Sequence, residues 1–467
     1  MVLLGLKLPP VLANSITYVL AVVVLHLGIV ANPGFFSHDE WQKYDHVHTL
    51  GIVDYIYAYG RVTSGSEFGY PVRPLGFIQQ GISALAMRSS PVIPHLFDVL
   101  LHAAIGLLLV ATLHKANADH RMSWLAGVMF AISPLTTFAT AWVAASFDQW
   151  STLFWLAAAY LTVSVIKDGA KWWSLSMMAT ISSLAILSKE NALVMPVVIP
   201  LVALALRDSK VPDRANRMQV ALLFAAATVP LLAYLAIRFP AIQSSVNGGV
   251  AGSYTPSGTH ISRNLVDYVS YPFLPRLIEL AEIARIPVYW IAGAFLLHGV
   301  LIVSVWREFG ATRAAIYCFS FLSYILLVLV LPATSPHYLY GSALPMSIAL
   351  AALWVMAIDR RRSKLLIVLV CMTTILAIHN FNIQRSMYQT GVCQSRFIDS
   401  LETAIRIDPT LKQVGLRLVG EPGAPIHVVQ RVLFGRDRYE ALDHMPISFS
   451  PDAAGVQLTV TSECTLR

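Results

Sequence analysis

Long runs of apolar residues, separated by short polar segments, are the main pattern along this chain. A run of about 20 apolar residues is long enough for a helix to cross the hydrocarbon core of a bilayer. The first run has few charges before it and spanning length, so we expect an uncleaved helix rather than a removed signal peptide. The pattern predicts about eleven spans, near residues 10–31, 95–114, 122–143, 149–166, 172–188, 190–206, 218–238, 287–306, 314–333, 338–358 and 365–382.

Two long polar segments and a polar tail complete this organisation. The predicted membrane domain covers residues 1–382 and contains the loops 32–94 and 239–286. Residues 383–467 are less apolar and predict a small separate domain. Within that domain we expect a helix over 395–407 and strands over 426–434 and 456–460. The expected fold class is therefore an all-α polytopic membrane protein with a small C-terminal α/β tail.

Composition and charge agree with a membrane location. Hydrophobic residues make up 56% of the 467 residues and charged residues 13%, which is too apolar for a soluble chain. The net charge of +7 comes largely from Lys and Arg in short links between the apolar runs, so no nucleic-acid partner is predicted. If the spans alternate, these links share one side, which the positive-inside rule makes cytoplasmic. Both long loops and the tail then lie on the opposite, extracytoplasmic face.

Charged residues at the outer ends of the spans are the candidates for chemistry. Asp39 and Glu40 follow the first span, Asp148 begins another, and Lys189 and Glu190 join two apolar runs with almost no spacer. Ionisable groups at the membrane margin often mark functional sites. Simpler interpretations remain, because Lys189 and Glu190 could form a salt-bridged turn and Asp148 could cap its helix.

Several short motifs follow one another in a recognisable order. They are 35–40, Arg73-Pro74-Leu75, 95–104, 130–134, Ala141-Trp142-Val143, 147–155, 187–190 and 337–340. On these motifs the chain resembles the polytopic GT-C glycosyltransferases over about residues 30–360. Among them it is most similar to the branch that contains the transmembrane and tetratricopeptide-repeat O-mannosyltransferases and their bacterial relatives.

The resemblance implies an inverting transfer of a monosaccharide from a polyprenyl-phosphate carrier to an acceptor hydroxyl. Such a hexosyltransferase needs a carboxylate to take the acceptor proton and cations to hold the departing lipid phosphate. The candidate bases are Asp39 and Glu40, and Asp39 aligns with the first acid of the family's acidic pair. The candidate substrate-binding residues are Arg73, Asp148, Lys189, Glu190, His337, Tyr338 and Tyr340.

One residue and the C-terminal tail depart from the family pattern. His337 stands where relatives commonly have Arg, and a His is mostly neutral at pH 7 unless a nearby anion raises its pKa. The tail lacks tetratricopeptide periodicity.

The bacterial relatives imply an inner (plasma) membrane enzyme whose site and tail face the periplasm, with undecaprenyl phosphate as the carrier. They also imply a surface-glycan acceptor such as O-antigen of lipopolysaccharide, with a protein hydroxyl as the alternative.

Other function classes fit the pattern less well. A lipid-linked sugar transporter or flippase would also be polytopic, but it predicts internal repeats and charged or helix-breaking residues near mid-bilayer, and neither is conspicuous here. An O-antigen polymerase or ligase predicts a large outer loop late in the chain, whereas this chain has its acidic loop first. The position of the acidic loop early in the chain therefore favours a monosaccharide transferase.

The Cys residues predict one disulfide and no metal site. Cys318 and Cys371 fall inside apolar spans, whereas Cys393 and Cys464 lie near the two ends of the outer tail, where an oxidising compartment permits a bond. We therefore predict a Cys393–Cys464 disulfide. Carboxylates and water suit Mg²⁺ or Mn²⁺, but relatives differ in metal use. The sequence thus predicts no certain cofactor and leaves a divalent cation open.

Overall fold

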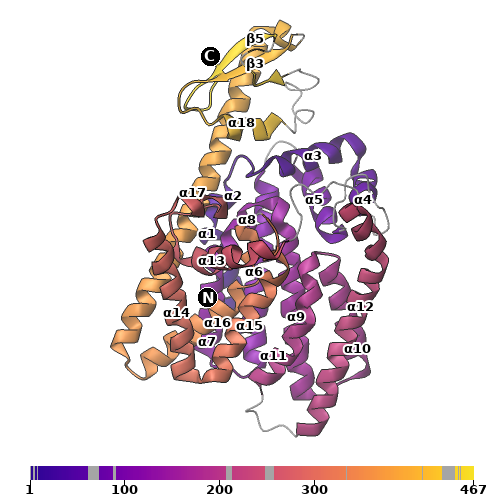
Figure 1. Ribbon diagram of the computed structural model, residues 1–467, viewed down its shortest axis with the longest axis vertical. Helices are drawn as coiled ribbons and strands as arrows, with labels where there is room; N and C mark the ends of the chain where they lie inside the picture. Colours follow the sequence, from indigo (N-terminus) through magenta and orange to yellow (C-terminus); the bar gives the residue numbers. More distant parts are fainter. Residues whose placement is uncertain are drawn as a thin grey trace.

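The computed structural model is a helical bundle with an outer helical layer at one end and a small C-terminal unit beyond that layer (Figure 1). It describes every residue except 1, 4–5, 8, 61–72, 88–90, 207–212, 248–256, 333, 413, 434–446, 451 and 453. Parts of the predicted loops 32–94 and 239–286 therefore lie outside the described residues.

Six helices in the described ranges are long and apolar enough to cross a membrane. They are α6 (Val92–Lys115), α9 (Ser146–Asp168), α12 (Asp213–Asn247), α14 (Val288–Phe309), α15 (Ala311–Ile325) continued by a 3-10 turn to Val328, and α17 (Ser363–Ile407). The helices α7 (His120–Ala131) and α8 (Pro134–Ala141), bent by 51° at their junction, make a seventh span if they are counted together. All of them lie where the sequence predicts spans, and the polytopic all-α fold class is confirmed.

Four further predicted spans are apolar helices of 10–17 residues. They are α1 (Pro10–Leu25), α10 (Trp172–Ile186), the segment Glu190–Ala205 and α16 (Ala343–Asp359). The third of these begins as the 3-10 helix η2 (Glu190–Val197) and continues as α11 (Val198–Ala205). Pro196 lies inside η2, and a proline cannot donate the backbone hydrogen bond that an α-helix needs there.

The outer layer carries the acidic pair that follows the first span. It contains α2 (Leu27–Val30), α3 (His38–Leu50), α4 (Ile52–Gly60) and α5 (Pro74–Met87). The helix α3 begins with a capping box, in which Ser37 Oγ accepts from the Asp39 amide and Glu40 Oε2 accepts from the Ser37 amide. The sequence Ser37-His38-Asp39-Glu40 therefore fixes the start of α3.

The C-terminal unit is built on α17, which runs without a break through residue 383, where the sequence predicts a domain boundary. Beyond it lie β3 (Leu416–Gly420), α18 (Ile426–Leu433), β4 (Ile447–Ser448) and β5 (Val456–Val460). The strand order is β4-β3-β5, and both outer strands run parallel to β3. The predicted helix over 395–407 is the last part of α17, and the predicted strand over 456–460 is β5.

The strand predicted over 426–434 is wrong, because this segment forms α18. Its buried residues are Val428, Val429, Val432 and Leu433, a spacing that places them on one side of a helix. A short apolar run does not by its composition distinguish a strand from a helix. The predicted disulfide between Cys393 and Cys464 is present, with a Cα–Cα distance of 5.2 Å.

The outer layer and the C-terminal unit share one hydrophobic core. Phe35, Trp41 and Tyr44 are buried in the same cluster as Phe397 of α17 and Val429 of α18. A second, larger core lies within the helical bundle. The segment that carries the acidic pair is thus packed between the membrane helices and the C-terminal unit.

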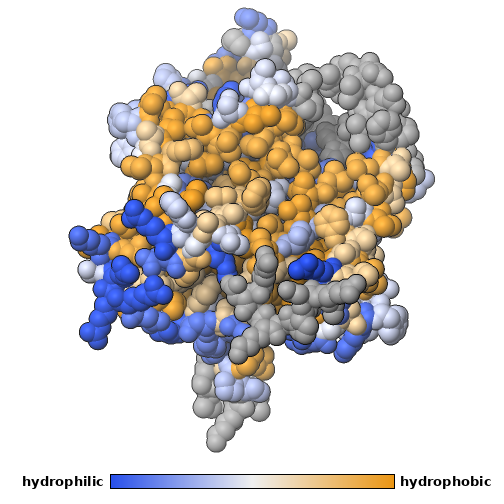
Figure 2. Space-filling model, turned by 60° about the horizontal axis from the view of Figure 1, so that its bottom comes forward, coloured by the Kyte–Doolittle hydropathy of each residue, from blue (hydrophilic) through white to orange (hydrophobic). Residues whose placement is uncertain are grey.

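The opposite end of the bundle gathers the charged links between spans. Lys115 pairs with Asp168 at 2.7 Å, and Arg121 pairs with Asp359 at 2.9 Å. Figure 2 shows hydrophilic residues grouped at the lower left of the view, below a broad apolar surface. The links that carry these ion pairs therefore lie together and away from α3 (Figure 1), while the orientation in a membrane stays a prediction.

Candidate active site

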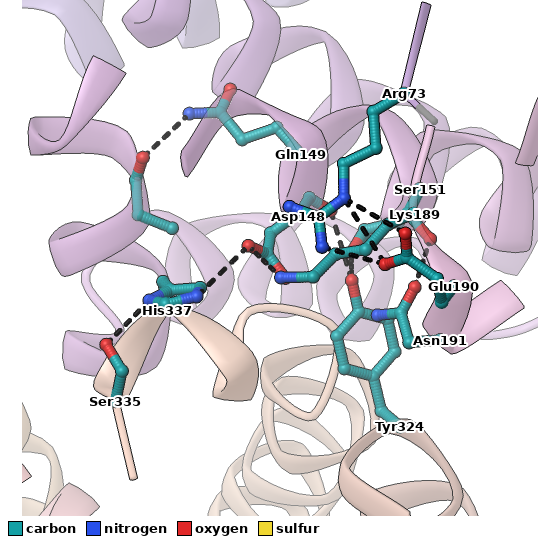
Figure 3. A network of polar contacts seen from close by, with 12 residues as sticks. Arg73, Asp148, Gln149, Ser151, Lys189, Glu190, Asn191, Tyr324, Ser335 and His337 are labelled. Atoms are coloured by element: carbon teal, nitrogen blue, oxygen red, sulfur yellow. Dashed lines mark hydrogen bonds and ion pairs between the residues drawn. The ribbon is translucent and has the colours of Figure 1, made fainter. Parts of the chain in front are cut away.

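Six of the predicted site residues converge in one cluster, and Figure 3 labels all of them except Tyr338, which contacts Lys189. Arg73 directly precedes α5, Asp148 lies in the first turn of α9, and Lys189 and Glu190 lie at the junction of α10 and η2. The last two members of the group, His337 and Tyr338, belong to the 3-10 turn η7 (Pro336–Leu339). Each residue stands where a helix begins or ends, which brings chain segments far apart in sequence to one place.

Lys189 and Asp148 form a buried ion pair. Lys189 Nζ lies 2.5 Å from both carboxylate oxygens of Asp148, and the side chains are 4% and 1% exposed. The ring of Tyr338 lies beside the same ammonium group, 4.4 Å from Nζ to the ring centroid. Burial lowers the pKa of Lys189, and the charge of Asp148 opposes this shift.

Arg73 and Glu190 form a second, more accessible pair. Arg73 Nη2 donates to Glu190 Oε2 at 2.8 Å, and Arg73 Nε lies 3.2 Å from the same oxygen. The two side chains are 23% and 32% exposed. Lys189 and Glu190 therefore do not form the salt-bridged turn that was one interpretation of the sequence, because each pairs with a residue from another segment.

His337 completes the cluster as a neutral group. Its Nε2 lies 4.0 Å from Asp148 Oδ2, and its Nδ1 shares a hydrogen bond of 2.6 Å with Ser335 Oγ. Burial, followed by the charges of Lys189 and Arg73, lowers the pKa of His337 well below its usual value. Burial and the nearby cations keep His337 neutral, so it does not supply the positive charge of the Arg that relatives commonly have at this position.

The acidic pair lies in two different environments. Glu40 is 1% exposed and caps its own helix. Burial raises the pKa of Glu40 to about 8, and the charge of Asp39 adds to this shift. Asp39 is half-buried. Burial thus favours the protonated form of Glu40 near neutral pH.

Two aromatic side chains connect this acidic turn with the ion pairs. Trp142 Nε1 donates to Ser37 Oγ at 3.1 Å, and the Trp142 ring lies 4.8 Å from the His337 ring. Phe147 is contacted by two cations, with Lys43 Nζ 5.3 Å and Arg73 Cζ 5.1 Å from its ring centroid. The turn and the charged cluster thus form one continuous site.

Lys43 is a site residue that the sequence did not single out. It lies on α3 four residues after Asp39, a spacing that places both side chains on one side of the helix. Burial lowers the pKa of Lys43 to about 8, and the charge of Asp39 opposes the shift. That helical spacing was the only signal that could have indicated Lys43.

Tyr340 is not brought to this cluster. Its side chain is buried, its hydroxyl makes a 2.7 Å hydrogen bond with His102 Nδ1, and its ring contacts Phe130. Asp148 is not the N-cap of its helix either, because Ala145 occupies that position. The described residues contain no group of three His, Cys, Asp or Glu side chains that could hold a metal ion.

Comparison with known proteins identifies a related family. Residues 74–234 match the family described as dolichyl-phosphate-mannose-protein mannosyltransferase. The match includes Asp148, Lys189 and Glu190, and it confirms the resemblance to GT-C glycosyltransferases. The branch within that superfamily stays a prediction. A search of curated proteins found no match.

Solved structures give weaker similarities. The oligosaccharyltransferase of Archaeoglobus fulgidus, tethered with an acceptor peptide, is 10% identical with a TM-score of 0.49, and the alignment covers 94% of this chain and 64% of that one. ArnT from Cupriavidus metallidurans, bound to undecaprenyl phosphate, is 12% identical with a TM-score of 0.46 and coverages of 93% and 90%. This chain thus spans less than two thirds of the oligosaccharyltransferase.

Proposed function

We propose that this chain is an inverting glycosyltransferase that moves a monosaccharide from a polyprenyl-phosphate carrier to an acceptor hydroxyl at the outer membrane face. One observation carries the proposal: Arg73 and Lys189 lie in one cluster at the ends of α5 and α10, and Phe147 and Trp142 connect this cluster to the acidic turn of α3. The matched family is named for a sugar donor on a lipid phosphate, which agrees with such a site.

Asp39 is the better candidate for the general base. A base must be deprotonated near the working pH and must reach the acceptor. Glu40 is buried, serves as a cap and has its pKa raised to about 8, so it meets neither condition at pH 7. Asp39 is half-buried at the start of the same helix, and the acceptor hydroxyl would pass its proton to this carboxylate.

The two ion pairs provide the cations for the lipid phosphate. Arg73 presents a planar guanidinium that suits a phosphate, and its partly exposed pair with Glu190 can exchange that carboxylate for the ligand. Lys189 adds a second positive charge beside Arg73. Glu190 and Asp148 hold these cations in place, while His337 and Tyr338 offer neutral donors beside them. The divalent cation stays an untested prediction, and no step here uses it.

The donor and the acceptor are proposed from the sequence resemblance. We propose undecaprenyl phosphate as the carrier in a bacterial inner membrane, with the site and the tail in the periplasm. The acceptor is then a surface glycan such as O-antigen. A protein hydroxyl is the second candidate, because the matched family is named for protein mannosyltransferases.

The test is release of the lipid phosphate by purified protein given a panel of polyprenyl-phosphate sugars with glycan or peptide acceptors. Asp39→Asn should lower turnover by about 10²-fold or more, whereas Glu40→Gln should keep most of it at pH 7. Asp54→Asn is the matched control, because Asp54 is an exposed acid on neighbouring α4. Undiminished turnover in Asp39→Asn would remove the assigned base, and no transfer from any donor would overturn the function.

A further inference from the structure

The segment that leads into the acidic turn is held by the outer half of α17. Asn32 Nδ2 donates to the Met387 carbonyl at 3.2 Å, and the Phe35 amide donates to Gln394 Oε1 at 2.8 Å. Between these two bonds the backbones of Gly34 and Gly391 approach closely. The path of residues 32–35 is therefore set by a helix that belongs to the C-terminal third of the chain.

A second contact reaches the same segment from α18. Arg431 Nη1 donates to the Phe36 carbonyl at 2.5 Å, and its guanidinium carbon lies 5.0 Å from the centroid of the Phe36 ring. One side chain thus holds both the backbone and the ring of Phe36. The helix α18 itself packs against α3 and α17, so the guanidinium is carried by a supported element.

Phe36 is directly joined to the acidic turn. It precedes Ser37, the N-cap of α3, whose hydroxyl accepts from the Asp39 amide. The Phe36 ring contacts Trp142 at 5.6 Å between centroids, and Trp142 donates to the same Ser37 hydroxyl. A shift of Phe36 would therefore move the turn and also Trp142, one of the two aromatic side chains that connect the turn to the charged cluster.

We propose that Arg431 is a positioning residue for the acidic turn, and that the C-terminal unit orients residues 36–40 toward the site through it. The planar guanidinium can donate a hydrogen bond and lie over a ring at the same time, which a Lys ammonium does less well. The disulfide from Cys393, one residue before Gln394, ties the end of the chain to the same part of α17. The catalytic consequence rests on the proposed glycosyltransferase function, whereas the structural contact does not.

The structural part is tested by amide hydrogen exchange in peptides that cover residues 35–41. Arg431→Ala should speed their exchange by about tenfold or more, because it removes a charge-assisted hydrogen bond and a cation–π contact. Arg431→Lys should give an intermediate rate. Arg467→Ala is the matched control, since Arg467 lies in the same unit but pairs with Glu421, and it should leave residues 35–41 unchanged. Exchange in α6 reports whether the bundle stays folded.

The catalytic part is tested by turnover of the same proteins. Arg431→Ala should lower kcat by about tenfold or more with little change in KM for the lipid donor, because a misplaced base slows the chemical step. Wild-type exchange rates over residues 35–41 in Arg431→Ala would overturn the proposal, as would faster exchange with unchanged kcat. If Arg431→Ala does not fold, Arg431→Lys decides by the same comparisons. If the wild-type protein transfers no sugar, the proposed function fails, and the exchange result still decides whether Arg431 positions the turn.

Discussion

Lys189 and Asp148 form an ion pair from which water is almost completely excluded. The ammonium nitrogen lies 2.5 Å from both carboxylate oxygens, and the two side chains are 4% and 1% exposed. Removing two charges from water costs several kcal/mol per ion, so a buried pair contributes little net stability over an apolar pair of similar size. The presence of this ion pair beside Arg73 and Glu190 is better explained by a functional need for the positive charge of Lys189.

Breaking this pair on one side should destabilise the protein strongly. Lys189→Met leaves the Asp148 carboxylate buried without its partner, and we expect a loss of about 3–5 kcal/mol. Thermal unfolding in detergent measures this loss. The double variant Lys189→Met/Asp148→Leu should recover most of the stability but no transferase activity. A double variant as unstable as the single one would contradict the charge-pair explanation.

Glu40 should make stability depend on pH. Because its pKa is raised to about 8 in the folded protein, the folded state binds this proton more tightly than the unfolded state does. Stability should therefore fall as pH rises from about 5 to about 8, by up to about 1.4 kcal/mol per pH unit from this group. Glu40→Gln should lose that contribution to the slope, as measured by unfolding temperature across the pH range. Glu463→Gln, at an exposed position of the C-terminal unit, should keep the wild-type slope, and an equal slope in Glu40→Gln would refute the assignment.

Arg73→Lys should weaken donor binding although it keeps the charge. The substitution removes the two-nitrogen contact with Glu190 and the contact with the Phe147 ring. We expect KM for the polyprenyl-phosphate sugar to rise by about tenfold, which corresponds to the loss of one charge-assisted hydrogen bond. Arg263→Lys, at an exposed position of α13 (Ile261–Ser270), should leave KM unchanged. Equal KM values in both variants would show that Arg73 does not hold the phosphate.

The sequence predicts the parts of this protein that depend on local pattern. A run of about 20 apolar residues is long enough for a membrane-spanning helix, and the six or seven helices of that length lie where spans are expected. Charged residues such as Lys189 and Glu190 stand out at the membrane margin because an ionisable group is costly there. The Cys393–Cys464 bond follows from the position of both residues in the tail.

The pairing of charges depends on tertiary packing and could not be predicted in the same way. Arg73 meets Glu190 across 117 residues, and Lys189 meets Asp148 across 41. Tyr338 and Tyr340 are two residues apart, yet one lies beside Lys189 and the other in the helical core. Tyr338 lies in the 3-10 turn η7 and Tyr340 directly after it, and two steps of about 120° along such a turn place residues on different sides.

Gly391→Ala should test the close approach between α17 and the segment before the acidic turn. A Cβ atom at this position would overlap Asn32 Oδ1 and would lie 2.7 Å from the Gly34 nitrogen. Because two backbones cannot easily separate there, we expect a loss of about 1–3 kcal/mol from overpacking, measured by thermal unfolding. Gly299→Ala is the matched control, since Gly299 also lies inside a helix but a Cβ there would meet nothing within 4 Å. That variant should be neutral or more stable by up to about 1 kcal/mol. If both variants unfold alike, the approach of Gly34 and Gly391 does not set the path of the chain into α3.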